Sequence, residues 1–242
     1  MNAPAPVAMN RWAGAWPDLA AFAAGLALAW FSGWETGDLI WSLWLSSLVV
    51  GYALILWTVS APLREVVGGI ARDPGIVEIS PWAKAGAIAL VGGGTLFGLA
   101  FFTVHFGGFH FVHSAFLNMF FPVTGQQGFP GWETYGIVLR RYWLFLPLAF
   151  MAERSAFARV SSHAPPDVSV TPEAIARRKA QAASSGMMAP YKGVIRMHLL
   201  IFFFAFAHFA RIESFAVYTV VYAVYFFPWR LVRNEAPATV AG

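Results

Sequence analysis

Long apolar stretches alternate with short polar connections along most of the chain, and this pattern predicts transmembrane helices. A helix needs about 20 mainly apolar residues to cross the hydrocarbon core of a bilayer. Trp residues stand near the ends of several stretches, as is typical of the membrane–water interface. We interpret six stretches as spans: residues 16–31, 38–58, 84–106, 135–152, 197–211 and 215–227.

A further apolar segment follows the third span and differs from the others because it contains several histidines. It reads His105-Phe-Gly-Gly-Phe-His-Phe-Val-His113, continues through a Phe-rich stretch and ends at Pro122. From Gly107 on it has only about 15 residues, which is short for a crossing, and Gly107-Gly108 offers a bend. We therefore predict a re-entrant or outer-leaflet helix here, in addition to the six spans.

The third span contains the run Gly92-Gly93-Gly94. Small residues allow helices in membranes to approach one another closely. Three successive glycines also weaken a helix and could mark a local break. Both interpretations remain open from the sequence.

The positions of Lys and Arg predict the orientation of the chain. All sixteen of these residues except Arg140, Arg141 and Arg211 fall on connections or termini that six spans place on one side. The positive-inside rule makes that side cytoplasmic, so we expect both termini in the cytoplasm. Counting residues 110–121 as a seventh crossing would move the basic connection 153–196 outside.

The chain is predicted to form one membrane domain with short flanks. Residues 1–15 make a Pro/Ala-rich arm, 16–234 the transmembrane domain and 235–242 a tail. Six or seven spans leave no room for a separate soluble domain. Within the cytoplasmic loop 153–196, residues 171–184 predict a short basic helix lying on anionic lipid, with a regulatory partner site as the alternative.

Composition agrees with a membrane protein and excludes several kinds of site. The chain is 58% hydrophobic and only 12% charged, whereas a soluble domain usually has about twice that charged fraction. The formal charge of +4 follows from the cytoplasmic connections, so membrane lipids and no nucleic acid are the expected partners. The absence of cysteine excludes disulfides, thiolate metal sites and iron–sulfur clusters.

A four-residue motif occurs twice. Gly33-Trp-Glu-Thr36 and Gly131-Trp-Glu-Thr134 each stand just before a span that runs from outside to inside. The motif indicates either a parallel internal duplication or a shared way of starting a helix, with Trp at the interface and Glu and Thr capping.

Ionisable residues gather at the predicted outer ends of the spans, and such groups are costly at membrane depth and usually functional. His110 and His113 are three residues apart, so a helix brings both rings within reach of one metal ion. Imidazoles with a carboxylate suit zinc, iron or copper, of which zinc or iron is favoured. The alternatives are hydrogen-bonded interfacial histidines, a proton relay, or a b-type haem. The candidate metal ligands are His105, His110, His113, His208, Glu35 and Asp38.

A second candidate group contains arginines and carboxylates near the same outer surface. Glu133 and Arg140 share a helix face, which favours an internal ion pair, and Glu35 or Asp38 could reach the arginines from the second span. Arginine also suits an anionic substrate or a lipid headgroup. The members of this group are Arg140, Arg141, Glu133, Arg211 and Glu213.

The segment His105–His113, set between a Gly-rich and a Phe-rich stretch, resembles a family of small prokaryotic polytopic membrane proteins known only as a domain of unknown function. The resemblance covers the second to sixth spans, and it implies a small bundle in a prokaryotic inner (plasma) membrane without indicating an activity. His113-Ser-Ala-Phe-Leu-Asn118 also resembles the His/Asn helix of rhomboid proteases. No span contains Gly-x-Ser-Gly, so we exclude a serine protease.

Three classes of function are compatible with the sequence. The first is a metal-binding membrane protein, whether or not it is an enzyme. The second is a non-catalytic accessory subunit of a membrane complex, whose ionisable residues hold helices together. The third is a proton- or anion-coupled transporter. We expect the first.

Overall fold

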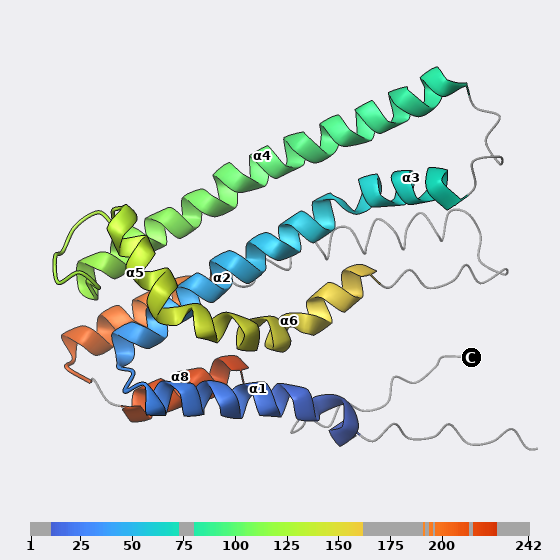
Figure 1. Cartoon of the computed structure of the whole chain (residues 1–242). Coiled ribbons are helices and arrows are strands. Elements are labelled where there is room, and N and C mark those ends of the chain that lie inside the picture. Colours follow the sequence, from blue (N-terminus) through green and yellow to red (C-terminus); the bar gives the residue numbers. More distant parts are fainter. Residues whose placement is uncertain are drawn as a thin grey trace, which may run out of the picture.

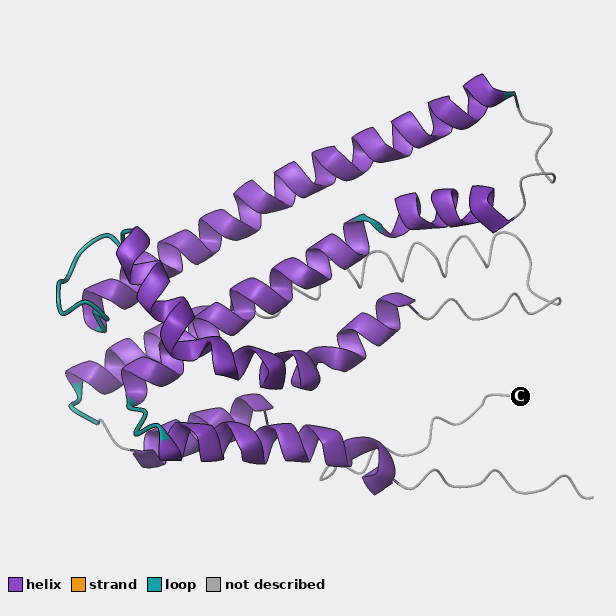
Figure 2. Cartoon of the chain, in the orientation of Figure 1, coloured by secondary structure: helices purple, strands orange, loops and turns teal. Residues whose placement is uncertain are grey.

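The computed structural model describes residues 11–72, 80–161, 191, 194–195, 197–212 and 215–226, and all regular structure within them is helical. This confirms the predicted all-α class (Figures 1 and 2). The elements are α1 (Arg11–Phe31), α2 (Thr36–Val59), α3 (Ala61–Arg72), α4 (Pro81–Phe120), α5 (Trp132–Tyr142), the 3-10 turn η1 (Trp143–Phe145), α6 (Leu146–Ser161), an apolar helix Met197–Phe209 and α8 (Phe215–Phe226). The basic segment 171–184 and residues 1–10 lie outside the described residues.

The helices form an elongated bundle with α2 near its middle. α2 contacts α4, α5, α6 and α8, and Leu39, Ile40 and Trp41 on it are fully buried. The connections 32–35 and 121–131 and the turn at 210–212 all lie at one end of the bundle, on the left in Figure 1. We call this the loop end.

Two of the described helices are long and apolar enough to cross a membrane. They are α2 and α4, each with a mean hydropathy of 2.0 over its most apolar window. Trp16–Phe31 and Met197–Phe209 are shorter apolar helices. The predicted second span is therefore reproduced by α2 within two residues at its start and one at its end.

α4 corrects the predicted break after the third span. It is one uninterrupted α-helix of 40 residues, about 60 Å long, so residues 107–121 do not form a separate re-entrant helix. Each helical glycine costs about 1 kcal/mol relative to alanine, but Gly107-Gly108 lies between Phe106 and His110, which are both buried against α2. Packing on α2 therefore supports the helix on both sides of the two glycines.

The Gly92-Gly93-Gly94 run also lies inside α4, so it marks no break. A Cβ atom built at any of the three would meet nothing within 4 Å. The run therefore makes no close helix contact with the described part of this chain. The close approach between α2 and α4 is instead at Gly51, where a Cβ would lie 2.5 Å from the Phe106 ring.

α2 and α4 pack antiparallel, and tryptophan side chains fix their register. Trp41 Nε1 donates to the carbonyl oxygen of Phe121 at 2.8 Å, and Trp44 Nε1 donates to that of His110 at 2.9 Å. Farther along, the hydroxyl groups of Tyr52 and Thr103 share a hydrogen bond. These bonds place the middle of α2 beside the histidine-containing half of α4.

Prolines explain the two interruptions in the neighbouring helices. α2 ends at Ser60, and Pro62 permits a new helix, α3, because a proline in the first turn needs no N–H donor. Residues 61–72 are thus helical, where the sequence suggested only a polar connection. Pro147 cannot donate to the carbonyl of residue 143, and the chain takes a 3-10 turn at Trp143–Phe145 before α6 begins.

Candidate functional site

The six predicted metal ligands do not meet at one place. Glu35 and Asp38 lie at the start of α2, whereas His110 contacts Ser47, about 14 Å farther along that helix at about 1.5 Å per residue. Among the described residues, no three His, Asp or Glu side chains approach closely enough to hold a metal ion. The predicted cluster is therefore resolved into a carboxylate group at the loop end and a deeper histidine group.

His110 is the most enclosed of the histidines that the structure describes, with 1% of its surface exposed. One ring nitrogen, Nδ1, lies 3.0 Å from the carbonyl oxygen of Phe106, and Nε2 lies 3.2 Å from Ser47 Oγ on α2. Because a carbonyl oxygen only accepts, Nδ1 must donate and Nε2 accepts from the serine hydroxyl. This ring is held in one tautomer and one orientation.

His113 pairs with His198, a residue that the sequence analysis did not select. His113 Nε2 lies 3.0 Å from His198 Nδ1 and 3.5 Å from His198 Nε2, and the ring centroids are 4.3 Å apart. His113 is buried and its Nδ1 has no hydrogen-bond partner, whereas His198 is exposed. The His110 ring is 6.0 Å from that of His113. We call His110, His113 and His198 the histidine group.

His105 and His208 lie apart from the histidine group. His105 is exposed and stacks on Phe101 at 5.4 Å, with Tyr191 at 5.8 Å. His208 contacts the rings of Phe120 and Phe121 at the loop end. Both predicted ligands are therefore in aromatic surroundings.

Polar residues spaced four apart form one stripe on α4 and another on α2, and both stripes face the interior. His110, Ser114 and Asn118 on α4 are buried, and the Ser114 hydroxyl shares a hydrogen bond with the Tyr135 hydroxyl at 2.9 Å. The Asn118 amide donates to two carbonyls of the connection 121–131. On α2, Ser42 and Ser46 donate back to carbonyls of their own helix. Ser42 and Ser46 thus make hydrogen bonds only within their own helix, whereas the α4 residues bond to α2, to α5 and to the connection 121–131.

Asp38 is the centre of the second group, where α2 meets α5. Its Oδ1 accepts from the Tyr142 hydroxyl at 2.7 Å and from Arg141 Nη2 at 2.9 Å. Its Oδ2 accepts from the backbone N–H of Glu35 at 2.9 Å, as in a capping box. A single buried carboxylate therefore starts α2 and joins it to α5.

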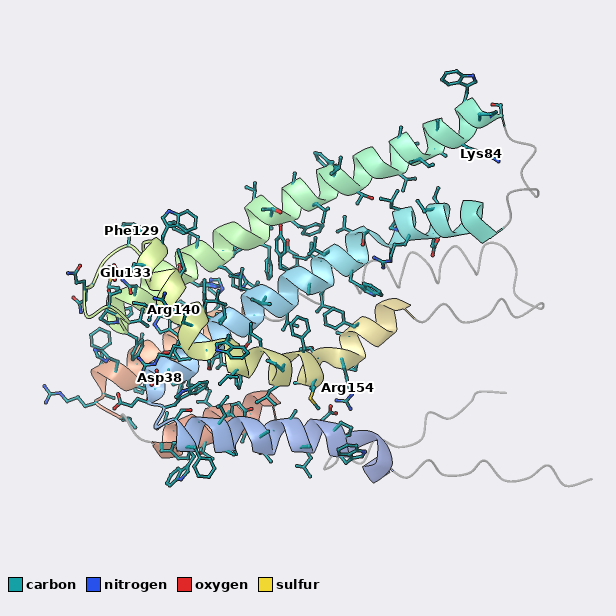
Figure 3. The ribbon with its side chains drawn as sticks, in the orientation of Figure 1. Asp38, Lys84, Phe129, Glu133, Arg140 and Arg154 are labelled. Carbon is teal, nitrogen blue, oxygen red and sulfur yellow. The ribbon has the colours of Figure 1, made fainter. Side chains whose placement is uncertain are left out.

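The ion pair at this end is Arg141–Asp38, one of the alternatives left open by the sequence. Arg140 and Glu133 are both exposed, and no ion pair joins them in the described part of the chain. Figure 3 shows Asp38, Glu133 and Arg140 at the loop end, with Lys84 at the far end of α4. Adjacent arginines on α5 therefore have different surroundings.

Arg211 has a structural position that the sequence did not reveal. Its φ of 55° is left-handed, and the N–H groups of Arg211 and Ile212 donate to His208 and Ala207. This is the Schellman pattern, which commonly has glycine at that position. α1 ends in the same pattern with Gly33 at φ 62°. Glu213 lies outside the described residues.

The two Gly-Trp-Glu-Thr motifs are structurally different. In the first, Glu35 is the N-cap of α2 and Trp34 is buried against Tyr142. In the second, Gly131 is the N-cap of α5 and Trp132 is 92% exposed. Both motifs start a helix, but at different residues of the motif, which favours a shared capping device over duplication.

Fold and site together define an all-helical protein with two helices that are apolar enough to cross a membrane and with a buried group of histidines. The chain belongs to a family of unknown function (DUF6498), whose model matches residues 5–227. No curated protein and no solved structure matches it. The resemblance to an uncharacterised family is thus confirmed, and it extends over the first apolar helix as well.

His198 and Tyr142 are the main site residues that sequence reasoning missed. The predicted span 197–211 has His198 near its start, whereas the candidate residues were taken from the predicted outer ends of the spans. Tyr191, Val194 and Ile195 are also helical, and the ring of His198 lies beside that of His113. Tyr142 is not among the candidate residues of the sequence, which are histidines, carboxylates and arginines. A search for residues level with His113 on a parallel span would have found His198.

Proposed function

We propose that this chain is a polytopic membrane protein that binds one transition-metal ion at its histidine group. The observation on which this rests is the separation of the His113 and His198 ring nitrogens, 3.0 and 3.5 Å. Two nitrogen ligands of a tetrahedral zinc ion, each at about 2.0–2.1 Å from it, lie roughly 3.3–3.4 Å apart. The pair therefore needs little movement to share one ion.

The membrane placement is supported by the surface of α4. Leu90, Leu96 and Phe97 are 79%, 70% and 75% exposed, and large apolar side chains are exposed along the whole helix. Soluble monomers rarely expose continuous apolar patches beyond a few hundred Å². Of the connections at the loop end, 32–35 and 121–131 contain no Lys or Arg and 210–212 contains one, Arg211; this low count agrees with an extracytoplasmic loop end.

We expect single cysteines in the variants Gly125→Cys and Ser185→Cys to react with a membrane-impermeant maleimide from opposite sides of the membrane. Gly125 lies in the connection at the loop end, and Ser185 lies in the basic connection. The natural chain has no cysteine, so it is its own labelling control. Reaction of both variants in intact cells would contradict the orientation.

His110 is the third candidate ligand. Its ring lies 6.0 Å from that of His113, and its Nε2 faces Ser47 rather than His113. In the described chain, His113 and His198 are thus already placed as ligands, whereas the His110 ring would have to rotate to bind the same ion. Zinc commonly completes its coordination with water. Neutral imidazoles suit zinc and iron, and zinc is the ion chosen for the test because its tetrahedral ligand spacing matches the separation of the two rings.

Purified full-length protein reconstituted with zinc is expected to retain about one ion per chain, measured by elemental analysis after removal of free metal. His198→Ala should lower retention to the background level, because it removes one of the two closest ligands. His198 is exposed, so the substitution leaves the packed interior intact.

His208→Ala is the matched control. It removes a histidine from the same helix, about 15 Å farther along it, and should leave metal retention unchanged. Protein that holds no metal, or that holds it equally well in the His198→Ala variant, would contradict the proposal and favour an accessory subunit.

A second function is favoured by one observation on the same pair. The Nδ1 atom of His113 is buried without a hydrogen-bond partner. An unsatisfied acceptor is less costly than an unsatisfied N–H, so His113 is best protonated on Nε2. It then donates to His198 Nε2 at 3.5 Å, because His198 Nδ1 lies 3.4 Å from the carbonyl oxygen of Val194, to which it can only donate. In that arrangement the pair holds one proton between a buried ring and an exposed one, as a proton-coupled transporter requires. The test compares metal-free wild-type protein with the His113→Ala and His198→Ala variants. Proton-driven uptake by the wild type that both variants lose would support a proton-coupled transporter over a metal-binding protein.

A further inference from the structure

A pocket opens at the loop end, about 14 Å along α2 from the histidine group. Its volume is about 520 Å³, within the range of small-molecule sites. Residues of α2, α5, α8 and the connections before α2 and after α4 line it. Segments that are far apart in the sequence therefore form the wall of the pocket, as is expected of a ligand-binding site.

The charged groups of this pocket have both signs. Two carboxylates, Glu35 and Asp38, and one guanidinium, Arg141, line it. Asp38 is held by three donors, whereas Arg141 keeps 53% of its side chain exposed and uses only Nη2 on Asp38. A guanidinium has five N–H donors, so most of those on Arg141 remain for a ligand.

Aromatic rings form much of the remaining wall. Trp34, Trp41, Phe121, Tyr142 and Phe215 line the pocket; Phe121 and Phe215 are partly exposed in it, whereas the other three rings are at most 7% exposed. Rings beside carboxylates are the surroundings that bind ammonium groups, because the ring face and the carboxylate both attract a cation. A guanidinium a short distance away is suited to bind a phosphate.

We propose that this pocket binds the zwitterionic headgroup of a phospholipid, with the ammonium group between the exposed Glu35 carboxylate and the partly exposed rings of Phe121 and Phe215, and the phosphodiester on Arg141. The inference uses the membrane placement proposed above, because the pocket lies where the apolar helices end and headgroups begin. It does not depend on metal binding. If the contacts of Asp38 served only to join α2 to α5, they would require neither a cavity nor an arginine whose side chain is half exposed. The cavity and the exposed part of Arg141 are therefore the features assigned to a ligand.

Arg140 and Arg141 provide a matched pair for the test. They are adjacent on α5 and carry the same charge, but Arg141 lines the pocket and Arg140 does not. Arg141→Gln and Arg140→Gln remove the same charge from the same helix. Glu35→Gln tests the ammonium side at an exposed residue, and Asp38 is left intact because its loss would disturb folding.

The experiment is a native mass spectrometry titration of the detergent-purified full-length chain with lipids of identical acyl chains. We expect phosphatidylethanolamine or phosphatidylcholine to bind about tenfold or more tightly than phosphatidylglycerol, which has the phosphodiester without the ammonium. Arg141→Gln and Glu35→Gln should each weaken binding by about tenfold, and Arg140→Gln by less than about twofold.

Glycerophosphoethanolamine, which has the headgroup but no acyl chains, tests whether the pocket binds a free headgroup compound or only a whole lipid. Binding of this soluble compound would show that the pocket also takes free headgroups, and binding of the lipid alone would show that acyl chains contribute. Equal binding of phosphatidylglycerol, or equal effects of the two arginine variants, would overturn the proposal. Zinc retention in the same variants should stay at the wild-type level, so failure here is distinguishable from failure at the histidine group.

Discussion

Asp38→Ala is expected to lower the free energy of unfolding by about 2–4 kcal/mol. The substitution leaves the buried Tyr142 hydroxyl and the Glu35 backbone N–H without their acceptor, and each unsatisfied group costs about 1–3 kcal/mol. The Arg141 pair adds little, since that arginine is half exposed and solvent screens the charge. Denaturant titration in detergent, followed by far-UV circular dichroism, measures the effect.

The control for this prediction is Glu133→Ala. Glu133 is acidic and in the first turn of α5, as Asp38 is in that of α2, but it is exposed. We expect a change within about 0.5 kcal/mol, as for most surface substitutions. A similar loss of stability in both variants would mean that helix-end charge, and not the buried network, determines the effect.

Gly51→Ala is expected to destabilise the chain by about 1–3 kcal/mol, although alanine is the better helix former. A Cβ at this position would lie 2.5 Å from the Phe106 ring, which is fully buried and also contacts His110 at 4.3 Å between ring centroids. The ring cannot move without displacing the histidine, so α2 and α4 must separate. The same unfolding titration measures the loss.

Gly107→Ala makes the same chemical change in α4, next to Phe106. A Cβ there meets nothing within 4 Å, so helix propensity alone should act and stabilise the chain by up to about 1 kcal/mol. Opposite signs for the two variants are the expected result. Stabilisation by Gly51→Ala would show that the two helices pack less closely than the structure describes.

The sequence predicts the helices well wherever local chemistry decides their limits. Ser80 caps α4, with Pro81 at its first position, and Pro62 ends the apolar run of α2, so these boundaries follow from residues near them in the chain. The inward polar stripe of His110, Ser114 and Asn118 also follows from helical spacing.

Contacts between distant segments could not be predicted from the sequence. His113 meets His198 because two parallel helices align in one register, and that register is set by packing along both of them. Likewise, His105 and His110 share one straight helix but face different surroundings, one exposed and one buried. Counting the ionisable residues on each predicted side of the membrane puts His105 and His110 in one group. In the structure they are separate, because the surroundings of a side chain depend both on the helix face that it occupies and on its position along the helix.

The Gly-Trp-Glu-Thr motifs show the same limit on a small scale. Identical letters predict a helix start in both places, and both helices do start there. The burial of Trp34 and the exposure of Trp132 depend on Tyr142 and Phe145, which only the first motif has beside it.

The unbroken length of α4 has a practical consequence for handling the protein. In the membrane placement proposed above, a hydrocarbon core about 30 Å thick covers roughly 39 Å of a helix tilted by 40°, the upper end of the usual range. About 20 Å of this 60 Å helix would then lie outside it, and Lys84 is the one charged residue among the 40. A detergent belt matched to an ordinary bilayer leaves the same length uncovered. Colloidal stability of the purified chain should therefore depend on micelle thickness more than on salt or pH.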